Sequence, residues 1–272
     1  MLNRNINREL VEYFKREKQP AKAKRIEECA NIIQWKVFNN HPEYTHKLDS
    51  INLCRERLCP NCATARARKK AVELLQAFQP YFDKGSVSFV TLTTENVSGK
   101  ELRTTVQKLT KAFKAFVRKL KIKEYFRSTE VTYDEKTDTY HPHLHVIMVT
   151  ENKFGLKQEV RRVWTECLHK EIHTKHAYVI TDVNTEPDEK SVLELCKYIT
   201  KPMNISQKTI PALNSLRDLQ LKRGSREITS TTKHVTEEYK REVSAETKEL
   251  MEQFEYSLIP YMWNGENYQR GI

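Results

Sequence analysis

The chain has 272 residues, of which 38% are hydrophobic and 9% aromatic, which suffices for one large core or for a core with a small appended module. No stretch approaches the roughly 20 apolar residues of a membrane span, and the opening sequence MLNRNINREL lacks the apolar run of a secretory signal, so we expect a cytoplasmic protein that does not bind membranes. Lysine and arginine outnumber aspartate and glutamate by 47 to 36, a net charge of +11, which indicates a polyanionic partner or, less specifically, general solubility.

The N-terminal region, residues 1–82, is expected to form a helical and zinc-binding module. Cys54, Cys59 and Cys62 lie within nine residues, and in a chain without a secretory signal this spacing favours a metal over disulfides. Free thiols are the alternative. A closed zinc site requires a fourth ligand, and the candidates in order of preference are Cys29, His41 and His46. Basic side chains suited to DNA contact surround the cysteines, namely Arg55, Arg57, Arg66, Arg68, Lys69 and Lys70.

Residues 83–205 contain the most regular pattern of the chain and are expected to form a second domain, preceded by a helix over 63–82. Residue types and spacing predict strands over 86–94, 127–133, 143–150 and 177–183, and helices over 101–121 and 156–170. This order is that of the ferredoxin-like, split βαβ arrangement. We therefore expect an α+β fold whose antiparallel sheet has helices on one face. A cluster of basic residues lies along the first of these two helices: Lys108, Lys111, Lys114, Arg118, Lys119, Lys121 and Lys123.

Two histidines on the third strand form a candidate metal site. Side chains alternate along a strand, so His143 and His145 face one side and the apolar residues among them face the other. If the polar turn at 134–140 pairs the second and third strands, Glu130 lies near both imidazoles. Such a mixed nitrogen and oxygen site with open positions suits Mn²⁺ or Mg²⁺. His141 shares the parity, but it precedes Pro142, so its direction stays open; a pair of surface histidines in a hairpin is the alternative interpretation.

A helix is expected over 188–201, where Pro202 ends it. At about 100° per residue, Glu194, Tyr198 and Lys201 share one face, opposite an apolar stripe. A phenol is a poor nucleophile at neutral pH unless a cation assists it, and Lys201 is placed to do so. Glu194 is placed to act as a general base toward water. The alternative is that Tyr198 is a half-buried packing residue.

Four segments together resemble one family, the Rep initiators of small rolling-circle plasmids from Gram-positive bacteria, within the HUH endonuclease superfamily. The segments are LCRERLCPNC at 53–62, FVTLTTEN at 89–96, HPHLHVIMV at 141–149 and ELCKYITK at 194–201. The resemblance extends over about residues 25–205. It implies a catalytic domain over 83–205 that nicks single-stranded DNA at a plasmid origin in the bacterial cytoplasm.

The resemblance also implies the role of each site residue. Tyr198 would attack the DNA backbone and form a 5′-phosphotyrosine link, and Glu194 would activate water for termination. His143, His145 and Glu130 would hold the catalytic Mn²⁺ or Mg²⁺, with His141 as a further candidate ligand, while structural Zn²⁺ would occupy the cysteine site.

The implied partners are single-stranded or hairpin DNA at the origin, a host helicase and a polymerase, for a monomer or a dimer. Residues 206–272 are expected to form a mostly helical or irregular tail, helical near 237–254, that binds the origin or a partner. Two other functions fit part of the pattern. One is a single-tyrosine HUH transposase or mobilisation relaxase. The other is a non-enzymatic zinc-dependent DNA-binding regulator, which explains the charge and the cysteines but not the face shared by Glu194, Tyr198 and Lys201.

Overall fold

The computed structural model describes residues 4–38, 46–150, 154–172, 182–184, 205–216, 228–230 and 256–270, with the backbone alone for 67–76, 79, 182–183, 228–230 and 256. The chain forms two compact units, Met1–Ala65 with Thr236–Ile272, and Arg66–Val235. These limits differ from the expected boundaries after residues 82 and 205, since both ends of the chain contribute to the first unit. Within the described ranges, no helix combines the length and the apolar character needed to cross a membrane.

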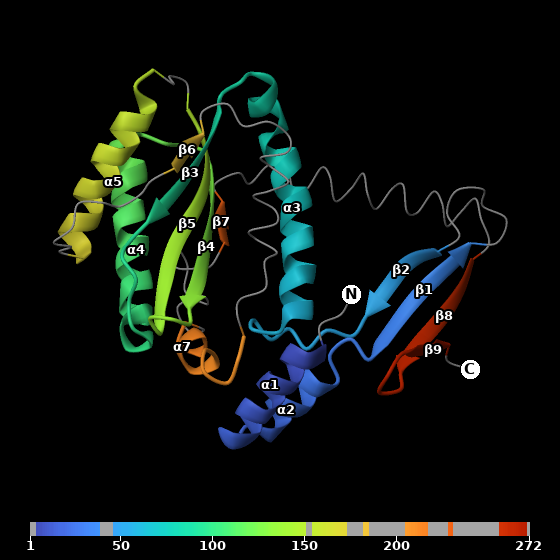
Figure 1. The fold of residues 1–272 in the computed structure, drawn as a ribbon. Helices are drawn as coiled ribbons and strands as arrows, with labels where there is room; N and C mark the ends of the chain where they lie inside the picture. The colour runs from blue at the N-terminus through green and yellow to red at the C-terminus, as the bar shows by residue number, and fades with distance from the viewer. Residues whose placement is uncertain are drawn as a thin grey trace. The chain divides into compact units, whose positions relative to one another are not determined.

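The second unit is built on a five-stranded antiparallel sheet with the order β6-β3-β5-β4-β7. Its strands are β3 (Val87–Thr93), β4 (Tyr125–Asp134), β5 (Thr139–Val149), β6 (Asp182–Asn184) and β7 (Ile228–Ser230). Helix α4 (Gly99–Lys119) connects β3 to β4, and helix α5 (Leu156–Ile172) follows β5 (Figure 1). The predicted α+β fold with an antiparallel sheet is therefore confirmed, and β5 lies between β3 and β4.

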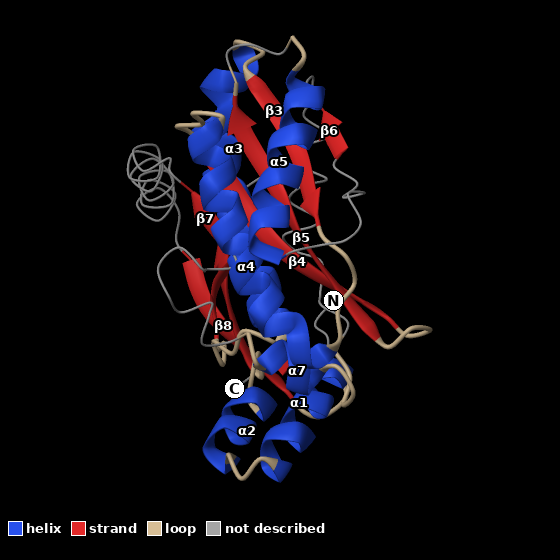
Figure 2. Cartoon of the chain, turned by 90° about the vertical axis from the view of Figure 1, so that its left-hand side faces the viewer, coloured by secondary structure: helices blue, strands red, loops and turns tan. Residues whose placement is uncertain are grey.

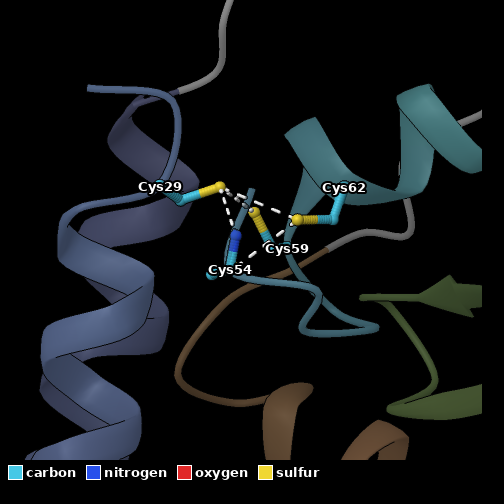
Figure 3. A group of neighbouring side chains, drawn as sticks. All are labelled: Cys29, Cys54, Cys59 and Cys62. Atoms are coloured by element: carbon cyan, nitrogen blue, oxygen red, sulfur yellow. Dashed lines mark hydrogen bonds between the residues drawn. The ribbon is translucent and has the colours of Figure 1, made fainter. Parts of the chain in front are cut away.

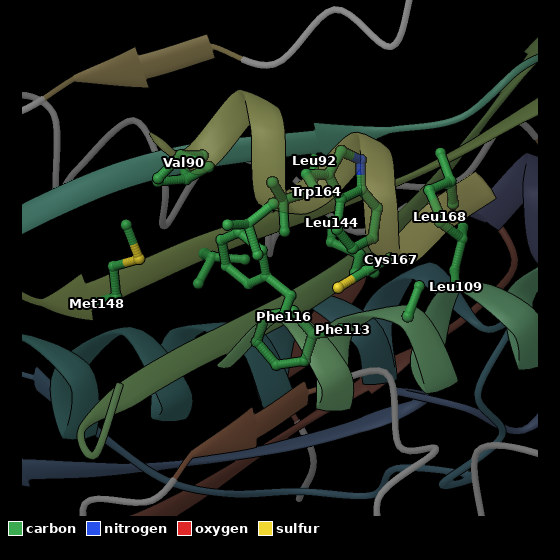
Figure 4. Close-up of a cluster of buried hydrophobic side chains, with 14 of the residues drawn as sticks. Val90, Leu92, Leu109, Phe113, Phe116, Leu144, Met148, Trp164, Cys167 and Leu168 are labelled. Carbon is green, nitrogen blue, oxygen red and sulfur yellow. The ribbon is translucent and has the colours of Figure 1, made fainter. Parts of the chain in front are cut away.

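Helices α4 and α5 pack side by side on one face of this sheet (Figure 1, Figure 2). Helix α4 begins at a capping box, in which the Ser98 amide donates to the Glu101 carboxylate at 3.2 Å. Trp164 of α5 is fully buried and donates its Nε1–H to the Thr93 carbonyl at 3.0 Å. Figure 4 shows the core between the helices and the sheet, which includes Val90, Leu92, Leu109, Phe113, Phe116, Leu144, Met148, Cys167 and Leu168.

Helix α3 (Pro60–Asp83) packs on the opposite face of the sheet through its C-terminal half. Its Ala77 and Phe78 form a second cluster with Phe126 of β4 and Ile147 of β5. Because side chains alternate along β5, His143 and His145 share the face of Ile147, whereas Leu144 and Met148 belong to the other core. The predicted division of this strand into a histidine face and an apolar face is therefore confirmed.

The first unit joins the two ends of the chain in one antiparallel sheet of order β2-β1-β8-β9. Its elements are α1 (Arg4–Arg16), α2 (Pro20–Glu27), β1 (Ile32–Phe38), β2 (His46–Ile51), β8 (Tyr256–Trp263) and β9 (Tyr268–Arg270). Every residue of β1 pairs with a residue of β8, from Ile32 opposite Met262 to Phe38 opposite Tyr256. The prediction of a mostly helical or irregular tail is thus wrong for 256–270. The sequence YSLIPYMW lacks polar alternation, and its partner strand lies more than 200 residues away.

Candidate functional site

The hairpin of β4 and β5 brings a carboxylate and two imidazoles together. Glu130 lies directly opposite His143 in the strand register. One carboxylate oxygen of Glu130, Oε2, lies 3.0 Å from His143 Nε2 and 2.9 Å from His145 Nε2. The three ligand atoms lie within 4.8 Å of one another, as required to hold one metal ion. The side chains are only 9% to 11% exposed, so the group is built into the sheet.

The electrostatics of this group favour a cation. Burial raises the pKa of Glu130, but hydrogen bonds with His143 and His145 outweigh it and hold the pKa at about 2. Glu130 is therefore an anion at any pH at which the protein would act. Two nitrogen donors and one oxygen donor form a mixed set that leaves coordination positions for substrate oxygens. The donor set therefore fits a divalent metal ion.

His141 lies beside this group without joining it. Its ring centroid is 5.3 Å from that of His143, but its nitrogens are not within 4.8 Å of all the other ligand atoms. The backbone carbonyl oxygen of His141 lies 3.1 Å from His143 Nδ1. Burial, and then the nearby His143, lowers the pKa of His141. The backbone carbonyl of His141 therefore supports the candidate ligand His143 through this hydrogen bond.

The four N-terminal cysteines converge on one point, as Figure 3 shows. Cys29 follows α2, Cys54 and Cys59 lie in the loop after β2, and Cys62 lies in the first turn of α3. The sulfur atoms are separated by 3.5 Å for Cys29 and Cys59, 3.7 Å for Cys29 and Cys62, and 3.5 Å for Cys54 and Cys62. A tetrahedral zinc site with bonds of about 2.3 Å has edges of about 3.8 Å. The cluster has the size of a Cys₄ zinc site.

Backbone amides surround these sulfurs. The amides of Arg55 and Glu56 donate to Cys62 Sγ at 3.2 Å and to Cys54 Sγ at 3.5 Å. Arg55 adopts a left-handed φ of 61° in this loop, a conformation that costs energy for a residue with a Cβ. Hydrogen bonds among the cysteines lower the pKa of Cys29 and Cys62 and raise the pKa of Cys54 and Cys59. The two amide donors favour the thiolate form of the sulfurs that accept from them, and the thiolate is the form that binds a metal.

A buried ion pair fixes the cysteine loop to helix α2. Lys22 Nζ lies 3.1 Å from Glu56 Oε2, with both side chains less than 8% exposed. The Lys22 ammonium also lies 3.5 Å from the centre of the Phe14 ring. Sequence reasoning missed this pair, because nothing in the spacing of Lys22 and Glu56 distinguishes them from surface residues.

Several predicted site residues lie outside the described ranges. They include the tyrosine helix over 188–201, with Glu194, Tyr198 and Lys201, and the alternative zinc ligand His41. The structure gives only the backbone for Arg68, Lys69 and Lys70. The helix expected over 237–254 also lies outside the described residues. Of the other basic residues near the cysteines, Arg55 is exposed, and Arg57 and Arg66 are partly buried.

Comparisons with known proteins agree on one family. A family model described as "Replication protein" matches residues 45–268. "Protein rep" of Streptococcus pneumoniae is 29% identical over 202 residues, which cover 66% of this chain and 60% of that protein. "Protein rep" of Bacillus amyloliquefaciens is 28% identical over 211 residues, covering 68% and 61%. "Protein rep" of Staphylococcus aureus is 31% identical over 135 residues, covering 47% and 58%. The alignments thus span about 60% of these relatives, and no solved structure gives a significant match.

Proposed function

Because the chain belongs to the replication protein family, we propose that it initiates rolling-circle replication of a plasmid by nicking single-stranded DNA at the origin. The observation that carries this proposal is the group formed by Glu130, His143 and His145, whose ligand atoms converge within 4.8 Å. The strand order β6-β3-β5-β4 supports a ferredoxin-like HUH endonuclease domain, since β5 lies between the strands that α4 connects.

The metal group would prepare the scissile phosphate for attack. When bound there, Mn²⁺ or Mg²⁺ neutralises the charge that develops on the phosphate oxygens. Glu130 supplies a permanent negative charge, and the two imidazoles supply neutral donors. The partial burial of all three excludes most water, which strengthens every electrostatic interaction at the site.

We further propose that Tyr198 is the nucleophile. Its phenolic oxygen forms a bond to phosphorus, the bond from phosphorus to the 3′ oxygen breaks, and the leaving oxygen takes up a proton. The products are a 5′-phosphotyrosine and a free 3′-hydroxyl. Lys201 lowers the cost of forming the phenolate, and Glu194 later activates water to release the protein.

The remaining parts would serve DNA binding. The Cys₄ cluster would hold Zn²⁺ and place Arg55, Arg57 and Arg66 near DNA phosphates, together with Arg68, Lys69 and Lys70. The partners would be single-stranded or hairpin origin DNA, a host helicase, and a polymerase that extends the 3′-hydroxyl. The tail beyond residue 205 would contribute to binding of the origin or of a partner.

The function is tested by trapping the covalent adduct. With Mn²⁺ and a single-stranded oligonucleotide from the plasmid origin, a protein–DNA adduct is expected, with the link mapped by mass spectrometry to Tyr198. Chelation of the metal should prevent its formation, and Tyr198→Phe should remove it entirely. An undiminished adduct in that variant would sink the assignment of the nucleophile.

Exposed basic residues on α4 and in the loop that follows it give a separate prediction about affinity. Lys114 and Arg118 of α4 and Lys121 and Lys123 of the loop are exposed, and none forms an ion pair with another residue in the described ranges. If they contact phosphates of origin duplex, replacing all four with glutamine lowers the slope of log Kd against log salt by up to about 0.9 per residue. Fluorescence anisotropy at several salt concentrations measures this. Glutamine at Lys18 and Lys84, which are also exposed, is the control; an equal change there would mean that the effect is general.

A further inference from the structure

The two histidines of the metal group are held by different partners at their second ring nitrogens. His143 Nδ1 lies 3.1 Å from the His141 carbonyl oxygen, whereas His145 Nδ1 lies 3.3 Å from Thr91 Oγ1. A carbonyl oxygen only accepts a hydrogen bond, while a hydroxyl both donates and accepts. His143 therefore carries hydrogen on Nδ1 in this contact, whereas the partner of His145 permits either tautomer.

The sheet places Thr91 against His145. Strand β3 is the neighbour of β5, and Thr91 lies directly opposite His145 in the register. Val90 and Leu92, on either side of it, are buried in the core under α4 and α5. Since alternate residues face opposite sides, the Thr91 side chain is left on the histidine face, where it is partly buried.

We propose that Thr91 is a positioning residue of the metal site. Its hydroxyl accepts the Nδ1–H of His145 and so keeps the Nε2 lone pair directed to the point where Glu130 and His143 converge. This inference rests on the proposed function, because it requires that the three residues hold a divalent cation. A histidine coordinates through one nitrogen only when its hydrogen is on the other, so the partner of the second nitrogen decides whether the ring can bind.

A hydroxyl suits this position because it can accept the Nδ1–H of His145. Nε2 of both histidines lies within 3.0 Å of the same Glu130 oxygen, so both nitrogens are directed to one point. A side chain without an acceptor at position 91 would leave the Nδ1–H of His145 without this hydrogen bond and the orientation of the ring without this support.

Metal affinity tests the inference without any use of nicking activity. The zinc-loaded full-length protein is titrated with Mn²⁺, and free Mn²⁺ is measured by electron paramagnetic resonance. Thr91→Val keeps the shape but removes the hydroxyl, and it should weaken the Mn²⁺ Kd by about 10- to 100-fold. Thr91→Ser restores the hydroxyl and should restore the affinity. The matched control is Ser128→Ala, which removes the hydroxyl of the other cross-strand neighbour of His145 and should leave the affinity unchanged.

The possible results separate the inference from the function on which it rests. Wild-type affinity in Thr91→Val would overturn the role of Thr91 while leaving the metal site in place. Weak binding by Thr91→Ser would overturn it too, because the hydroxyl would not be the group that matters. Absence of Mn²⁺ binding by the wild-type protein would overturn the metal site itself. Thermal unfolding without Mn²⁺ verifies that each variant is folded.

Discussion

Glu130→Ala is expected to remove Mn²⁺-dependent cleavage of origin DNA. Glu130 is the only charged ligand among the three that converge, and one of its oxygens contacts both imidazoles. Its loss leaves two neutral donors, which bind a hard cation weakly. A catalytic metal contributes several kcal/mol of transition-state stabilisation, so the rate should fall by at least about 100-fold. Single-turnover cleavage of a labelled oligonucleotide at fixed Mn²⁺ measures this loss.

Two further variants make that result specific. Glu130→Gln retains the shape and one acceptor oxygen but loses the charge, so its activity should lie between those of the wild type and Glu130→Ala. Glu135→Ala removes an exposed carboxylate in the turn that joins β4 and β5 and should leave cleavage unchanged. If Glu130→Ala cleaved at the wild-type rate, with the same dependence on Mn²⁺, the catalytic metal would have to be held elsewhere.

The sequence was sufficient to predict the part of the second unit that holds the candidate metal site, because the signals there are local. Apolar periodicity placed β3, α4, β4, β5 and α5 in the right order. The hairpin of β4 and β5 is joined by a short turn, so its pairing, and with it the approach of Glu130 to His143, followed from alternation alone. Thr91 was missed, although the same alternation in the segment FVTLTT places it on the face of the histidines once β3 is known to pair with β5.

Contacts between distant segments could not be predicted in this way. Strand β8 becomes evident only from its pairing with β1, in which Ile32 lies opposite Met262 and Phe38 opposite Tyr256. Both strands are only partly buried, so neither shows a strict alternation of apolar and polar residues. The sequence favours Cys29 over His41 and His46 as the fourth zinc ligand only because of its residue type. Its sulfur position depends on the turn after α2, which no local pattern specifies.

The cysteine cluster leads to the second large expected effect, the loss of the first unit's fold in Cys62→Ser. Cys62 Sγ contacts the sulfurs of Cys29 and Cys54 and accepts from the Arg55 amide. Serine is a poor substitute for a thiolate at zinc, so the metal should be lost. Structural zinc contributes about 10–16 kcal/mol in small zinc-binding domains, which equals or exceeds the total stability of about 5–15 kcal/mol of a typical domain. Zinc content and amide hydrogen exchange in β1 and β8 measure the effect.

Cys167→Ser supplies the matched control, because Cys167 is also buried but lies in the core under α4 and α5. A buried hydroxyl without a good partner costs about 1–3 kcal/mol, so this variant should lose some stability in the second unit. It should keep its zinc and its slow exchange in β1 and β8. The reason for expecting this contrast is that Cys29 lies between α2 and β1, while its partners lie in the loop after β2 and in the first turn of α3. A zinc ion held by the four cysteines would therefore close the loop that contains β1 and β2. Full zinc content in Cys62→Ser would show that Cys62 is not a required ligand. Zinc-free protein with unchanged exchange in β1 would show that the sheet is stable without the metal.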